Sequence, residues 1–150
     1  MNYSFTTTAI TKMPNLIYNE TLTTVASVGA FACCYNLIDG GTYKGTTSAN
    51  TFANCVNLKS IHIGLNAITA TNTFTNCKKL KYVTIEPGHS KALYLSASTE
   101  FTSEILHAII ENLGDLTGAT ALAFTIGSDN LAKIDEEHIT MLENKNWNYS

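Results

Sequence analysis

Two short motifs place acidic and histidine side chains where they could bind a metal. Glu104-Ile105-Leu106-His107 is a Glu-x-x-His, whose spacing puts both side chains on one helical face, as di-iron proteins require. A working site needs a second such motif and two further carboxylates on facing helices. The only similar motif, with an acidic residue three positions before a histidine, is Asp135-Glu136-Glu137-His138. We therefore expect two solvated helix surfaces, with no metal or other cofactor; a metal-dependent enzyme using His107 and His138 is the alternative.

No other pattern in the chain is typical of catalysis. No Ser-His-Asp or Cys-His pair has a recognisable catalytic context, and no glycine-rich phosphate loop follows a strand. Gly40-Gly41 and Gly45 predict a flexible loop, and His89, beside the turn signal Pro87-Gly88, is expected to be exposed. We expect a protein that is not an enzyme.

Composition narrows the range of partners. The 150 residues have the size of one domain, expected to span 1–150, and carry a net charge of −3. All nine basic residues are Lys, so no arginine-rich footprint for nucleic acid exists. No run approaches the ~18 apolar residues of a membrane span, and the start lacks the features of a signal peptide. We expect neither nucleic-acid binding nor membrane insertion.

The strongest pattern is a repeat. Residues 52–63 and 74–85 share Phe, Asn, Cys, Leu, Lys and two aliphatic residues at an offset of 22. The core of the pattern recurs in Phe31–Leu37 and, with Ile for Phe and Met for Cys, in Ile10–Leu16, each 21 residues upstream of the next. Such a unit cannot bury its own apolar face, so neighbouring units must stack.

Each unit is expected to supply one short strand, since Ile61-His62-Ile63 and Val83-Thr84-Ile85 alternate apolar and polar residues. Stacked units then form a parallel ladder of about four turns. The cysteines are expected to be buried free thiols. After Leu37 and Leu16, glycine and polar residues replace the aliphatics, so the amino-terminal half is expected to be looser, more loop-like, or dependent on a partner. The predicted inward ladder is Phe31, Cys34, Leu37, Phe52, Cys55, Leu58, Phe74, Cys77 and Leu80.

After about residue 90 the repeat motif no longer occurs and helical patterns alternate with strand patterns. This change predicts a carboxy-terminal cap over about 91–150 that continues the ladder in parallel. An open end of a stack exposes apolar surface and strand edges, so the terminal unit must differ from the internal ones. The expected elements are a strand at 92–95, a helix capped by Thr102 or Ser103 and ended by Gly114 or Gly118, a strand at 122–126, a helix from Asp135 to Asn144, and a strand at 147–149.

The motif Phe-x-Asn-Cys-x-x-Leu-Lys-x-Ile/Val-x-Ile resembles the leucine-rich repeats of the BspA type, which occur in bacterial surface proteins and in virion proteins of bacteriophages. Segments such as Leu113–Gly118 and Asn130–Ile134 are similar to the end of leucine-rich-repeat proteins encoded by phages and prophages of gut bacteria. The resemblance implies an α/β leucine-rich-repeat solenoid with a strand-helix cap. It further implies a virion protein of the tail or the capsid surface; a bacterial extracellular adhesin fragment is the alternative.

Strand alternation predicts an outward polar and aromatic sheet face, and solenoids commonly bind through such surfaces. Tyr and His could stack on sugar rings while Ser and Thr bond hydroxyls. The expected partners are host cell-surface protein or polysaccharide, or other virion subunits in a purely structural role; a homo-oligomer is compatible with either. The candidate binding residues are Ser60, His62, Tyr82, Thr84, Tyr94 and Thr125, with Ala123 and Asn148 beside them.

Overall fold

The computed structural model describes residues 9–12, 29–45 and 50–150. Within them the chain has an α/β fold with two three-stranded parallel sheets and three helices. The first sheet contains β1 (Asp39–Tyr43), β2 (Ser60–Ile63) and β3 (Tyr82–Ile85). The second contains β4 (Leu93–Tyr94), β5 (Leu122–Thr125) and β6 (Trp147–Tyr149). The helices are α1 (Ser103–Asn112), α2 (Ser128–Leu131) and α3 (Glu136–Asn144).

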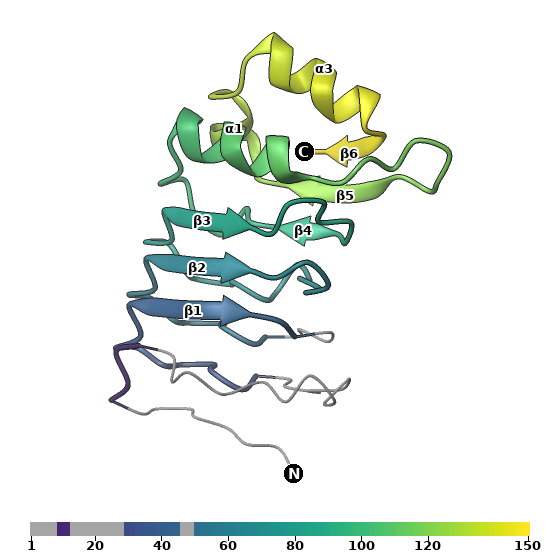
Figure 1. Ribbon diagram of the computed structural model, residues 1–150. Coiled ribbons are helices and arrows are strands. Elements are labelled where there is room, and N and C mark those ends of the chain that lie inside the picture. The colour runs from purple at the N-terminus through teal and green to yellow at the C-terminus, as the bar shows by residue number, and fades with distance from the viewer. Residues whose placement is uncertain (1–8, 13–28, 46–49) are drawn as a thin grey trace.

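The strands of the first sheet lie one above another, and so do the chain segments that join them (Figure 1). From β2 to β3 the register pairs Ser60 with Tyr82 and Ile63 with Ile85, an offset equal to the sequence repeat. Equivalent residues of successive repeats are therefore neighbours in space, and a favourable contact made once is made again in the next unit.

The phenylalanine at the start of each repeat builds a column of stacked rings. The ring centroids of Phe31 and Phe52 lie 5.5 Å apart at an interplanar angle of 8°, and those of Phe52 and Phe74 lie 5.6 Å apart at 9°. Offset stacking at this separation adds to the free energy gained by burying the rings. The nine residues of the predicted inward ladder are all buried.

Cys34, Cys55 and Cys77 form a second buried column, and these three and Cys33 are all free thiols. Cys55 Sγ donates to Phe31 O at 3.0 Å, and Cys77 Sγ donates to Phe52 O at 3.1 Å. Burial raises the pKa of Cys77 to about 12 and raises that of Cys55 still further. These thiols are therefore protonated donors that satisfy carbonyls of the preceding repeat, with no thiolate available for chemistry at neutral pH.

The asparagine two residues after the phenylalanine allows the chain to turn. Asn54 and Asn76 both adopt φ of 63°, the left-handed region that asparagine tolerates better than most residues. Asn76 Nδ2 donates to Asn54 Oδ1 at 2.6 Å, so the side chains also link successive turns. The repeat motif thus specifies the turn as well as the core.

Two of the three glycines predicted to form a loop, Gly40 and Gly41, instead lie within strand β1, whereas Gly45 lies after it. The pairing of Asp39 with Ser60 and of Thr42 with His62 differs in offset by one residue, which is a bulge at Gly40-Gly41. Gly41 has φ of 56° and its N–H donates to Asp39 Oδ1 at 2.9 Å. The bulge keeps β1 in the sheet, so the loop prediction was wrong here. Beyond the bulge Tyr43 is buried, at the place that Ile63 takes in β2.

The first predicted repeat is shifted. Asp39 lies eight residues after Phe31, whereas Lys12, which pairs with Asp39, lies two residues after Ile10. Ile10 therefore does not stand in register with Phe31, and the proposed offset of 21 was wrong for this unit. The remainder of that unit, residues 13–16, and the segment after it, residues 17–28, lie outside the described residues.

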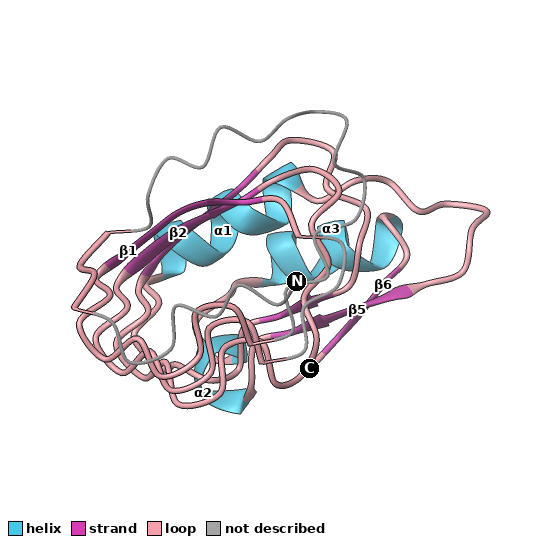
Figure 2. Ribbon diagram, turned by 90° about the horizontal axis from the view of Figure 1, so that it is seen from below, coloured by secondary structure: helices cyan, strands magenta, loops and turns pink. Residues whose placement is uncertain are grey.

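The cap does not continue the first ladder as predicted. β4 pairs with β5, not β3, and Figure 2 shows β1 and β2 on the opposite side of the molecule from β5 and β6. The reason is that β4 does not occupy the place of β1, β2 and β3 in its repeat. It lies in the segment that runs back along the opposite side of the molecule, which we call the returning half of the turn. There Tyr94 N donates to Thr69 Oγ1 at 2.8 Å, and Thr69 belongs to the returning half of the preceding turn.

Helix α1 lies across β3, at the end of the first sheet (Figure 1). Thr102 caps it by accepting from Ile105 N, as one of the two predicted caps. The helix ends at Asn112, before either predicted glycine. Gly114 serves another purpose: a Cβ there would lie 2.8 Å from Gly88 O, so two chain segments can approach closely only because this residue is glycine.

Helix α3 begins at the predicted cap, because Asp135 Oδ1 accepts from His138 N at 2.9 Å. At its other end Lys145 Nζ donates to Ile110 O, Glu111 O and Leu113 O at 2.8–3.1 Å. These carbonyls belong to the end of α1, so one lysine satisfies groups that the helix itself leaves unbonded. No helix in the described part of the chain is long and apolar enough to cross a membrane.

Candidate binding surface

The outward side of the first sheet carries most of the predicted binding residues. In β2 and β3 the aliphatic residues are buried, while Ser60 and His62 are half-buried and Tyr82 and Thr84 are exposed. This alternation follows from the pleat of a strand. We call the surface formed by Asp39, Thr42, Ser60, His62, Tyr82 and Thr84 the outer face.

The outer face consists of two rows that run across the strands. One row contains Asp39, Ser60 and Tyr82, and Ser60 Oγ donates to Asp39 Oδ1 at 3.2 Å. The other contains Thr42, His62 and Thr84, and His62 Nδ1 lies 2.8 Å from Thr84 Oγ1. The hydrogen bonds join equivalent places of successive repeats and fix the side chains before any ligand arrives.

Between the rows lies a shallow hollow of about 350 Å³. It is lined by the outer face together with Gly41 and Ile61. Gly41, which belongs to the bulge in β1, contributes backbone and no side chain to this lining. The volume lies within the range of small-molecule sites, about 300–1,000 Å³.

Charges lie at the edges of the outer face. The N–H of Gly41, together with the hydroxyl of Ser60 and the ammonium of Lys12 at 3.3 Å, lowers the pKa of Asp39, which is therefore a carboxylate at neutral pH. At the opposite edge Glu86 Oε2 lies 3.7 Å from His62 Nε2. The face thus offers hydrogen-bond acceptors at both edges and hydroxyl groups between them.

Tyr82 is the most exposed large apolar side chain of the described residues, with 55 % of its surface accessible. The Lys81 ammonium lies 5.0 Å from its ring centroid, a separation at which a cation is attracted to an aromatic ring. An exposed aromatic ring beside hydroxyl and carboxylate groups offers one apolar and several polar contacts to the same ligand.

Tyr94 and Thr125 do not belong to the outer face. They pair with each other in the second sheet, where Ser150 Oγ donates to Thr125 Oγ1 at 3.3 Å. The predicted single face is therefore divided between two sheets, with Ser60, His62, Tyr82 and Thr84 on one and Tyr94 and Thr125 on the other.

The sequence reasoning missed Asp39 and Thr42 because it treated their segment as a loop. A usable signal was present, since Asp39, Ser60 and Tyr82 each lie eight residues after the phenylalanine of their repeat. Thr42 could not be found by counting, because the bulge adds one residue before it.

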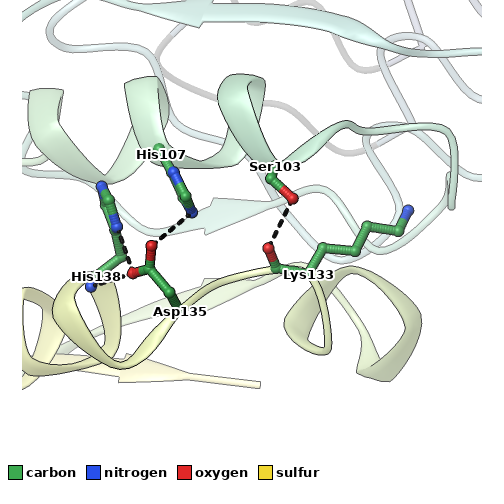
Figure 3. A network of polar contacts seen from close by, with 5 residues as sticks. All are labelled: Ser103, His107, Lys133, Asp135 and His138. Carbon is green, nitrogen blue, oxygen red and sulfur yellow. Dashed lines mark hydrogen bonds and ion pairs between the residues drawn. The ribbon is translucent and has the colours of Figure 1, made fainter.

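A second polar cluster lies between α1 and α3 (Figure 3). The rings of His107 and His138 stack with centroids 3.6 Å apart, and Asp135 contacts both, at 2.7 Å from His138 Nδ1 and 3.6 Å from His107 Nε2. The prediction of two solvated helix surfaces was wrong for His138, which is buried, and for His107, which is half-buried. Glu104 remains exposed and takes no part.

His89 is fully buried, contrary to the prediction. The backbone N–H of His89 donates to Glu86 O and Asn112 O, and the backbone carbonyl of His89 accepts from Gly114 N. These bonds to the segment around the end of α1 hold the residue where its side chain is buried. Burial lowers the pKa of the imidazole, and nearby backbone groups of Gly64, Lys91 and Leu65 offset this only in part. His89 is therefore neutral at pH 7 in the folded protein.

Comparison with known proteins adds no assignment: no family model, no curated protein and no solved structure matches the chain. The resemblance to BspA-type repeats accordingly stays an expectation from the motif.

Proposed function

We propose that this chain is a non-enzymatic leucine-rich-repeat interaction module of a bacteriophage virion, in the tail or on the capsid surface, and that its outer face binds host-surface carbohydrate. The observation that carries the binding role is the hollow lined by Asp39, Ser60, Tyr82, Thr42, His62 and Thr84, which are the outward residues of successive repeats.

The repeat geometry supports the solenoid part of the proposal. Parallel strands pair at the repeat offset, and the phenylalanine and cysteine columns run through consecutive units. Solenoids stack units in this way and commonly bind through the extended surface that their strands create. The virion assignment rests on the resemblance of the repeat motif and of the cap segments to sequences of phage-encoded leucine-rich-repeat proteins.

The chemistry of the outer face favours a carbohydrate. A sugar ring presents an apolar side that packs on an aromatic ring, here Tyr82, while its hydroxyls require both donors and acceptors. The Asp39 carboxylate is an acceptor only, and the hydroxyls of Ser60 and Thr84 can act in either sense. A shallow open hollow suits part of a polymer chain better than it suits an enclosed small molecule.

Binding to insoluble peptidoglycan and to a panel of soluble cell-surface polysaccharides from gut bacteria tests the proposal. We expect the wild-type chain to bind at least one of them and Tyr82→Ala to lower the affinity about tenfold, which corresponds to ~1.4 kcal/mol. Tyr94→Ala is the matched control, because it makes the same change on the other sheet, and should bind as wild type. Absence of binding to every polysaccharide, or equal binding by all three proteins, would count against the proposal.

A structural role in virion assembly is the second candidate, favoured by apolar side chains that remain exposed. Tyr35 and Val56 occupy the same place in successive repeats and are 49 % and 40 % accessible. Apolar exposure at equivalent positions suits contact with another subunit. Light scattering tests this, since assembly predicts self-association or association with other virion proteins that Val56→Asp weakens, whereas a monomer indifferent to that change argues against it. A bacterial surface adhesin fragment would use the same outer face and differ only in location.

A further inference from the structure

His107, Asp135 and His138 bring three metal-binding groups together from two elements. His107 lies within α1, Asp135 is the N-cap of α3, and His138 lies in the first turn of α3 (Figure 3). One ligand atom from each lies within 4.8 Å of the other two. The segments are far apart in sequence, so the fold of the cap alone creates the cluster.

The three side chains do not satisfy all of one another's hydrogen-bonding atoms. His107 Nε2 is buried and has no hydrogen-bond partner, and Asp135 Oδ2 lies 3.6 Å from it, too far for a hydrogen bond. Two ligands at about 2.0–2.2 Å from one ion in a tetrahedral arrangement are roughly 3.3–3.6 Å apart. The His107–Asp135 separation therefore matches two ligands of one ion.

We propose that His107 Nε2, His138 Nδ1 and Asp135 Oδ2 bind a divalent transition metal ion such as Zn²⁺, which ties α1 to α3. Two imidazole nitrogens and one carboxylate suit zinc, nickel or copper, whereas calcium and magnesium require mainly oxygen ligands. Three protein ligands leave the fourth tetrahedral position to water.

Binding requires one ring to turn. The two imidazoles lie nearly parallel, with an interplanar angle of 7°, and the lone pair of each nitrogen lies in its own ring plane. One ion cannot lie in both planes while the rings stay stacked. His107 is the ring free to move, since its side chain is 25 % accessible and its Nε2 makes no hydrogen bond, while the His138 side chain is only 10 % accessible and bonded to Asp135.

Asp135 can serve the ion without giving up its structural task. Its Oδ1 accepts from His138 N at 2.9 Å and caps α3, which leaves Oδ2 on the side of His107. The ion replaces the 2.7 Å hydrogen bond between Asp135 Oδ1 and His138 Nδ1, a bond that turns His138 toward the cluster before metal arrives.

Titration of the metal-free 150-residue chain with Zn²⁺ alone tests the site, in a Cys33→Ser background that removes the one partly accessible thiol. We expect saturable binding of one ion per chain and a rise in melting temperature on Zn²⁺ addition. His107→Gln should weaken binding by roughly 10- to 100-fold or more. Asp135→Asn should weaken it as well, while asparagine preserves the helix cap.

His62→Gln is the matched control, because His62 Nε2 also lies near a carboxylate, 3.7 Å from Glu86, without a second histidine beside it. It should bind Zn²⁺ as the parent does. With Co²⁺ as probe, the parent should show visible absorption of a tetrahedral site that His107→Gln lacks. No saturable binding, or binding of equal affinity in the parent and in folded His107→Gln and Asp135→Asn, would overturn the proposal.

Discussion

His62 Nδ1 lies 2.8 Å from Thr84 Oγ1, the hydroxyl oxygen of the residue that takes the same place on the next strand. The contact joins two repeats on the outside of the first sheet, as the stacked rings of Phe52 and Phe74 join them on the inside. Repetition of the motif thus orders the core and the proposed binding surface together.

The phenylalanine column predicts a large loss of stability in Phe52→Ala. The ring is fully buried and stacks on both of its neighbours, so its removal leaves a cavity in the middle of the stack. We expect the free energy of unfolding to fall by about 3–5 kcal/mol in urea titrations. Tyr35→Ala, at an exposed position, should change it by less than ~0.5 kcal/mol. A similar small effect for both would contradict the column.

The turn asparagines predict a difference between two substitutions at Asn76. Alanine disfavours the φ of 63° that the turn requires, whereas glycine adopts it without strain. Both changes remove the 2.6 Å hydrogen bond to Asn54. Urea titrations should therefore find Asn76→Ala less stable than Asn76→Gly by about 1–2 kcal/mol. Equal stability of the two variants would show that the left-handed turn is not required.

The cap predicts a structural role for Lys145. Its ammonium donates to three carbonyls at the end of α1, and glutamine is too short and too weak a donor to replace it. We expect Lys145→Gln to lower the free energy of unfolding by about 1–3 kcal/mol. Lys44→Gln, at an exposed position, is the control. Hydrogen exchange should locate the loss at residues 109–113; protection equal to wild type there would count against the capping role.

Buried His89 predicts acid sensitivity. Its pKa is lowered in the folded protein from an ordinary value of 6.5, so below that value the unfolded chain binds more protons than the folded one. Its contribution to stability is complete above pH 6.5 and is lost as the pH falls toward the lowered folded pKa. The slope is at most about 1.4 kcal/mol per pH unit. Urea titrations between pH 7.5 and 5 should show this decline in wild type and a smaller one in His89→Gln, with parallel declines as the contrary result.

Much of the fold follows from the repeat, because identical residues at a fixed offset can pack on each other and form hydrogen bonds with the neighbouring unit only when the units are stacked. Cys55 bonds to Phe31 O and Cys77 to Phe52 O in the same way, so one motif specifies both units. The helix caps also depend on local sequence: Asp135 was predicted as a cap from its side chain, and Thr102 was one of two candidates for the other helix.

What the sequence did not reveal depends on contacts between distant segments. Gly40-Gly41 resembles a loop, and only pairing with Ser60 and His62 makes it a bulge. The stacking of His107 on His138 needs the packing of two helices, which no local pattern encodes. His89 follows a surface-type turn signal, yet backbone bonds to Asn112 place it in the core.

Mapping of backbone amide resonances during titration with a bound polysaccharide fragment tests whether the outer face binds carbohydrate. Binding by the outer face predicts that the resonance shifts concentrate on β1, β2 and β3, at Thr42, Ser60, His62, Tyr82 and Thr84, and leave Tyr94 and Thr125 unchanged. Shifts centred on the second sheet, or binding that leaves the outer face unperturbed, would contradict it.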